Sequence, residues 1–118
     1  MTRSCFGFTN VNGTITTVYC NDLDTDFLFE SYSNVDQIKQ LMQWGDLMSF
    51  TYDSIRYYNE DEFSPDYSPT FDTIEDVAKY YYECGCNSLH IFSENEWMSY
   101  TINSHDEHCY VHPARVIA

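Results

Sequence analysis

Residues 5–19 read Cys-Phe-Gly-Phe-Thr-Asn-Val-Asn-Gly-Thr-Ile-Thr-Thr-Val-Tyr, and this stretch decides the fold. Two runs rich in aromatic and β-branched residues, 5–9 and 14–19, flank a short connection. Such residues favour strands because their side chains pack well on a pleated sheet. Asn12-Gly13 provides two residues that tolerate positive φ, as a tight hairpin turn requires. The stretch therefore predicts a β-hairpin.

Helical spacing of apolar residues predicts two helices further along the chain. The first begins at Asn34, which with Gln37 resembles a capping pair, and it ends at Gly45, where a C-terminal cap belongs. The second runs from about Ile74 to Cys84 and carries an apolar stripe along one side. Both helices are therefore expected to pack one face against a core.

The other segments read as strands and one long loop. Residues 47–58 resemble one or two strands, and residues 88–92 and 96–102 resemble a second hairpin. A further short strand is expected at 110–112. Residues 59–72 are acidic and contain two prolines, which block regular structure. This stretch is therefore predicted to be a loop.

Hairpins that alternate with helices predict the fold class. We expect an α+β fold with an antiparallel sheet, built from the N- and C-terminal β-hairpins, and two helices packed on one face. The 118 residues suit a single acidic domain spanning 1–118, with 103–118 as a more loosely ordered tail. Eight Phe, eleven Tyr and two Trp supply a core that an acidic disordered tail lacks.

The charge balance narrows the range of partners. Nineteen acidic residues face five Lys and Arg, which gives a formal net charge of −14. Direct binding of nucleic acid or of an anionic membrane needs clusters of Lys and Arg, so both are disfavoured. The chain has no run of 18 apolar residues and no signal-peptide pattern, which predicts a soluble cytoplasmic protein. The expected partner is a basic protein surface or a cation. The alternative is a solvated surface that serves solubility alone.

The carboxylates fall into three clusters along the sequence, and aromatic residues are interleaved with them. The clusters are Asp22, Asp24, Asp26 and Glu30; Glu60, Asp61, Glu62 and Asp66; and Asp72, Glu75, Asp76 and Glu83. The aromatic residues are Tyr57, Tyr58, Phe63 and Tyr67. Carboxylates at high density can imitate the phosphates of DNA, and aromatic side chains serve as interface anchors. These residues are the predicted partner-binding site.

The segment 2–20 carries the pattern Thr-Arg-Ser-x-Phe-Gly-x-x-Asn-x-Asn-Gly-Thr-Ile-x-x-Val-Tyr-Cys. It resembles a family of small uncharacterised proteins encoded mainly by bacteriophages and prophages. Weaker similarity extends over 35–47 and 89–97, which brings the total to about half of the chain. Family members usually continue with His-Trp-Asp-Gly-Tyr-Pro, whereas residues 21–26 here read Asn-Asp-Leu-Asp-Thr-Asp. The resemblance implies a phage origin and a similar fold, but no activity.

These observations lead to a functional hypothesis. The chain is expected to be a phage-encoded inhibitor of a host nucleic-acid-handling or defence protein, such as a restriction or CRISPR complex. It would act in the cytoplasm of the infected bacterial host cell, through a DNA-mimic-like acidic surface that occupies a basic groove. Two copies of such a surface could imitate a longer duplex, so a homodimer is compatible with the hypothesis.

Metal binding and catalysis are the alternatives. Five cysteines, an odd number, are expected to be thiols in a reducing cytosol. A small zinc-dependent or hydrolytic enzyme could use Cys and His, and the zinc ligands would be Cys84, Cys86, His105, His108 and Cys109. The spacing is not a standard zinc pattern. Cys5 or Cys20 could be a nucleophile, but nothing in the sequence places a histidine beside either thiol.

Calcium is a further alternative for the alternating carboxylates of Asp22, Asp24 and Asp26, because hard cations prefer oxygen ligands. An EF-hand loop starting at Asp22 would need Gly at its sixth position and Glu at its twelfth, and the chain does not match this pattern, since Phe27 occupies the sixth position. The sequence therefore assigns no catalytic residue and no cofactor.

Overall fold

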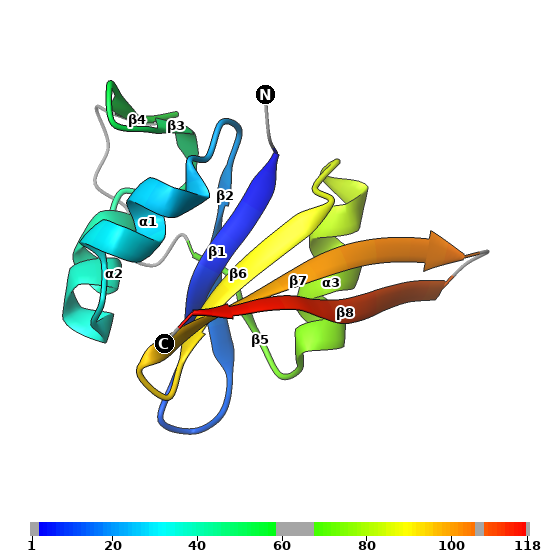
Figure 1. Cartoon of the computed structure of the whole chain (residues 1–118). Helices are drawn as coiled ribbons and strands as arrows, with labels where there is room; N and C mark the ends of the chain where they lie inside the picture. Colours follow the sequence, from blue (N-terminus) through cyan, green and yellow to red (C-terminus); the bar gives the residue numbers. More distant parts are fainter. Residues whose placement is uncertain (1–2, 59–67, 106–107, 118) are drawn as a thin grey trace.

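The computed structural model describes residues 3–58, 68–105 and 108–117, with side chains as far as residue 102. Within these residues the chain forms three helices and eight strands (Figure 1). Their order is β1 (Ser4–Thr9), β2 (Ile15–Cys20), α1 (Thr25–Ser31), α2 (Val35–Met42), β3 (Leu47–Phe50), β4 (Ile55–Tyr57), β5 (Thr70–Phe71), α3 (Ile74–Glu83), β6 (Ser88–Ser93), β7 (Glu96–His105) and β8 (His108–Ile117).

The strands form one mixed sheet, so the predicted antiparallel sheet is wrong. The strand order is β4-β3-β2-β1-β6-β7-β8, with β5 paired to β2. Both predicted hairpins, β1–β2 and β6–β7, are antiparallel and therefore correct. They join each other through β1 and β6, however, and this pair is parallel. The pair β2–β3 is also parallel, because α1 and α2 carry the chain back to the same end of the sheet before β3 begins.

The helices lie on both faces of the sheet, so the prediction of two helices on one face is also wrong. Figure 1 shows α1 and α2 on one side and α3 on the other. Phe6, Phe8 and Phe92 pack under α1 and α2, whereas Leu89 and Ile91 pack under α3. Strands β1 and β6 are buried on both faces, and such strands need a covering layer on each side.

Helix α1 was not anticipated from the sequence. Asp24 is its N-cap, and the Asp24 carboxylate accepts a hydrogen bond from the backbone N–H of Phe27 at 3.2 Å. Leu28 is the fully buried residue of this short helix. The alternating aspartates suggested a loop, but an aspartate at the N-cap starts a helix by accepting one of its free N–H groups.

The other two helices match their predictions closely. Asn34 caps α2 by accepting a hydrogen bond from Gln37 N–H at 2.9 Å, and Gln37 Oε1 in turn accepts from Ser33 N–H. Gly45 follows α2 with a φ of 81°, a conformation that glycine adopts without a steric penalty. Thr73 caps α3 in the same way as Asn34 caps α2.

The outer edge of β2 is shared between β5, an aspartate side chain and β3. The N–H of Thr17 donates to Pro69 O, and the N–H of Asn21 donates to Leu47 O. Between them, the N–H of Tyr19 donates to the carboxylate Oδ1 of Asp46 at 2.9 Å. Asp46 thus bridges the gap between two short strands, and it satisfies a backbone donor that neither strand reaches.

We predict that Asp46→Ala lowers the free energy of unfolding by about 1–3 kcal/mol, because the Tyr19 N–H loses its acceptor. Asp46→Asn keeps an acceptor oxygen at the same position, and it is expected to stay within about 1 kcal/mol of the wild type. Urea denaturation of the two variants makes the comparison. Equal destabilisation by both would show that the carboxylate charge, and not the hydrogen bond, matters here.

A buried histidine lies on the face of the sheet that α1 and α2 cover. His90 is 6% exposed, and its Nδ1 lies 2.7 Å from Ser99 Oγ on the neighbouring strand. Its Nε2 is buried and has no hydrogen-bond partner. The ring of Phe29 meets it edge-on at 5.6 Å. Burial lowers the pKa of His90 from 6.5 to about 4, so the folded protein holds this imidazole neutral at pH 7.

We therefore predict an acid-sensitive contribution from His90. As the pH falls from 6.5 to about 4, the unfolded chain binds a proton that folded His90 does not, so the free energy of unfolding decreases by about 3 kcal/mol. The double variant His90→Leu/Ser99→Ala removes both polar partners and is expected to lose this contribution. Urea denaturation at pH 7.5 and 4.5 measures it, with Ser99→Ala alone as the control that keeps the histidine. Parallel pH profiles for the double variant and the wild type would contradict the prediction.

Candidate interaction surface

The first acidic cluster gathers around an exposed tyrosine that the sequence did not single out. Tyr52 is 61% exposed, and its hydroxyl donates a hydrogen bond to Glu30 Oε2 at 2.6 Å. Its ring lies 4.5 Å from the ring of Phe27, measured between centroids. Tyr52 lies in the turn between β3 and β4, so a contact distant in sequence brings it beside α1.

The pKa of Tyr52 shows that several carboxylates act on this one phenol. It is raised to about 12, first by the hydrogen bond to Glu30 and then by burial and the negative charges of Glu30, Asp24 and Asp26. The structure therefore places three members of the predicted cluster within electrostatic reach of a single side chain. We call Asp24, Asp26, Glu30 and Tyr52 the α1 acidic surface.

A hollow lined by both apolar and polar side chains borders the α1 acidic surface. It has a volume of about 440 Å³ and lies between α1, α2 and β4. Its lining residues are Phe27, Ser31, Tyr32, Gln37, Gln40, Leu41, Ile55 and Tyr57. Phe27 belongs to the hollow and also contacts Tyr52, so charged and apolar surfaces meet at this residue. Protein interfaces combine an apolar centre with a polar rim in this manner.

The predicted cluster around the second helix lies on the other side of the molecule. Glu75 and Asp76 are in the first turn of α3, Asp72 precedes them, and Glu83 is the last residue of the helix. All four are exposed. Because α3 covers the face of the sheet opposite to α1, these carboxylates and the α1 acidic surface do not belong to one continuous face.

The structure describes only some of the other residues of the predicted partner-binding site. Glu60, Asp61, Glu62, Phe63, Asp66 and Tyr67 lie outside the described residues. The Tyr57 hydroxyl donates to Leu41 O at 2.6 Å, so this side chain fastens β4 to α2. Tyr58 is 49% exposed, and its ring lies 6.3 Å from that of Tyr19. Asp22 is exposed on the connection from β2 to α1.

The cysteines of the described part of the chain are poor candidates for nucleophiles. Burial raises the pKa values of Cys20 and Cys86 to about 12. Burial also raises the pKa of Cys5, and it raises that of Cys84 together with the charges of Asp46 and Glu83. A thiol reacts as its thiolate, which a raised pKa makes scarce near neutral pH. These four side chains therefore lack the electrostatics of a catalytic cysteine.

The metal hypotheses meet a similar test. Within residues 3–58, 68–105 and 108–117, no three His, Cys, Asp or Glu side chains with described positions are arranged to hold a metal ion. Of the proposed zinc ligands, Cys84 is exposed and Cys86 is buried. In the β7–β8 hairpin His105 pairs with His108, and Cys109 pairs with Ser104; the side chains of these four lie outside the described set.

Comparison with known proteins finds no family model, no curated protein and no solved structure that matches this chain. The resemblance to phage proteins therefore stays a hypothesis. In the part of the chain that the structure describes, no helix is both long enough and apolar enough to cross a lipid bilayer.

We predict that Glu30→Ala lowers the pKa of Tyr52 from about 12 towards the ordinary value of 10, because the hydrogen bond to Glu30 is the largest cause of the shift. Titration of ¹³C-labelled tyrosine by NMR measures it, with Tyr52→Phe to assign the signal. The control is Asp36→Ala, which removes an exposed carboxylate from α2 and is expected to leave Tyr52 unchanged. Titration of wild-type Tyr52 near 10 would contradict this arrangement.

Proposed function

We propose that this protein is a phage-encoded inhibitor that binds the basic surface of a host nucleic-acid-handling or defence protein. The observation that carries the proposal is the α1 acidic surface, where an exposed tyrosine is hydrogen-bonded to Glu30, feels the charges of Asp24 and Asp26, and lies beside a hollow. In this proposal the carboxylates take the place of DNA phosphates, and Tyr52 is the central aromatic anchor.

Charge supports a basic partner over an acidic or neutral one. The net charge of −14 produces a negative field around the whole protein. Such a field speeds encounter with a positively charged groove and repels nucleic acid itself. Grooves of this kind occur in proteins that hold DNA or RNA, such as restriction and CRISPR complexes, because they must neutralise phosphates. Occupation of the groove would exclude the nucleic acid.

The hydrogen bond from Tyr52 to Glu30 supports a role in binding. An exposed tyrosine that is already fixed loses little conformational freedom when a partner covers it. Tyrosine is also enriched among the residues that dominate interface energies. The neighbouring hollow would then receive an apolar side chain of the partner.

The experiment compares two triple variants that each remove three negative charges. Asp24→Asn/Asp26→Asn/Glu30→Gln alters the α1 acidic surface, and asparagine at position 24 still caps the helix. Asp72→Asn/Glu75→Gln/Asp76→Asn alters the opposite face and is the matched control. Each tagged protein captures partners from bacterial lysate, and duplex DNA is then added as a competitor.

We expect the wild type and the triple variant at residues 72, 75 and 76 to capture the same nucleic-acid-binding protein, and added DNA to displace it. The triple variant of the α1 acidic surface should retain roughly tenfold less of that protein. Purified target and wild-type protein should then show competition with labelled DNA. Equal retention by both triple variants would refute the role of the α1 acidic surface. A captured protein that DNA does not displace would refute occupation of a nucleic-acid groove.

A further inference from the structure

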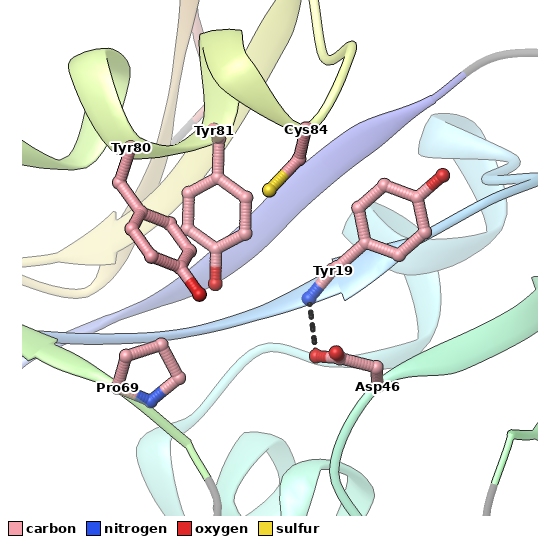
Figure 2. A pocket seen from close by; sticks show the side chains of 6 residues that line it. All are labelled: Tyr19, Asp46, Pro69, Tyr80, Tyr81 and Cys84. Atoms are coloured by element: carbon pink, nitrogen blue, oxygen red, sulfur yellow. Dashed lines mark hydrogen bonds between the residues drawn. The ribbon is translucent and has the colours of Figure 1, made fainter.

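A second cavity, of about 330 Å³, lies where the edge of β2 faces α3. Its lining residues are Tyr19, Asp46, Pro69, Tyr80, Tyr81 and Cys84. Figure 2 shows Tyr80, Tyr81 and Cys84 pointing from α3 towards the strand that carries Tyr19, with Asp46 and Pro69 on the other side. The cavity exists because β3 and β5 each cover only one end of β2.

Asp46 supplies the charge of this cavity. It is half-buried, and its Oδ1 accepts the Tyr19 N–H at 2.9 Å. A carboxylate offers about four lone-pair sites, so one backbone donor leaves most of its acceptor capacity unused. Burial raises the pKa of Asp46, and the Tyr19 N–H partly offsets that rise. Neither cause is a positive charge, so no cation among these causes offsets the burial of the carboxylate.

The negative charge of Asp46 extends over the neighbouring groups. After burial, it is the next cause of the raised pKa of Cys84. It contributes less to the raised pKa values of Tyr81 and Cys86, and at Cys86 the positive charge of Arg3 acts in the opposite direction. An anionic ligand would meet the same unfavourable field. A cation would instead relieve it, because opposite charges at short range stabilise each other most where water is partly excluded.

The walls of the cavity are aromatic. The ring of Tyr81 is fixed by a hydrogen bond between its hydroxyl and Thr17 Oγ1 at 2.8 Å. The ring of Tyr80 lies against it at 4.9 Å in an edge-to-face arrangement. Tyr19 adds a third ring. The faces of aromatic rings attract ammonium and guanidinium groups, and the attraction grows when these groups lose water.

We propose that this cavity binds one organic cation, a guanidinium or alkylammonium group, with Asp46 as its counter-ion and the tyrosine rings as its walls. The volume lies at the lower end of small-molecule sites, so it suits one side chain or a small amine. A partner's arginine and a free amine share this chemistry. The site does not depend on the proposed inhibitor function, because it shares no residue with the α1 acidic surface.

The test uses the full chain labelled with ¹⁵N and Nα-acetyl-arginine amide as the probe. The Tyr19 amide reports directly, because its N–H donates to Asp46. The matched neutral probe is Nα-acetyl-citrulline amide, which has nearly the same shape without the charge. We expect the arginine probe to shift the Tyr19 signal with a Kd on the order of millimolar, and the citrulline probe to bind at least tenfold more weakly.

Two variants locate the effect. Asp46→Asn keeps the acceptor for Tyr19 and removes the charge, and it should weaken the arginine probe at least tenfold. Asp36→Asn on α2 removes the same charge elsewhere and should leave the Kd unchanged. Equal Kd values of the arginine and citrulline probes for the wild type would overturn the proposal. This comparison uses the wild-type protein alone, so it does not depend on whether a variant folds. Unchanged binding by Asp46→Asn would overturn it as well.

Two more ligands distinguish an arginine side chain of a protein partner from a free small amine. Agmatine represents a free amine, and a decapeptide with one central arginine represents a partner's side chain. Tighter binding of the peptide assigns the cavity to a protein partner, and tighter binding of agmatine assigns it to a small molecule. The α1 triple variant should retain both affinities, so failure of the inhibitor function and failure of this site give different results.

Discussion

Strand β1 is hydrogen-bonded along both edges and buried on both faces. The positions of the other elements follow from these two requirements, because each edge needs a neighbouring strand and each face needs a covering layer. Strands β2 and β6 take its backbone hydrogen bonds. Phe6 and Phe8 require the cover of α1 and α2, whereas Cys5 on the other face packs with residues of α3. At Gly7 a β-carbon would come within 1.9 Å of Thr16 O, so the two strands of the first hairpin approach closely only because glycine lacks a side chain.

Local signals predicted the local structure well. The first hairpin, the helix cap at Asn34 and the second hairpin are all where short-range patterns put them. In that second hairpin Glu94 and Asn95 both adopt positive φ, as a tight turn demands. The strand expected at 110–112 is part of the longer β8. Such features depend on neighbours a few residues away, and the sequence contains those neighbours.

Longer-range features were not predictable in the same way. The parallel pairing of β1 with β6 and the separation of the helices onto two faces depend on contacts between distant segments. Continuous burial along β1 and β6 did leave a signal, since strands covered on both faces lose the alternation of polar and apolar residues. Helix α1 was hidden because Asp24, its cap, sits among other aspartates that resemble a loop. Tyr52 was missed because its partner Glu30 is 22 residues away.

The pairing of β1 with β6 has a consequence for synthesis of the protein in the cell. Ser4 and Ser88 pair across these strands and are 84 residues apart, so the centre of the sheet closes only after most of the chain has left the ribosome. Until then the first hairpin has one unpaired edge and lacks the cover of α3 on one apolar face. The nascent chain therefore exposes an unpaired strand edge at this stage, and the acidic residues that begin at Asp22 oppose its association with other chains through like-charge repulsion.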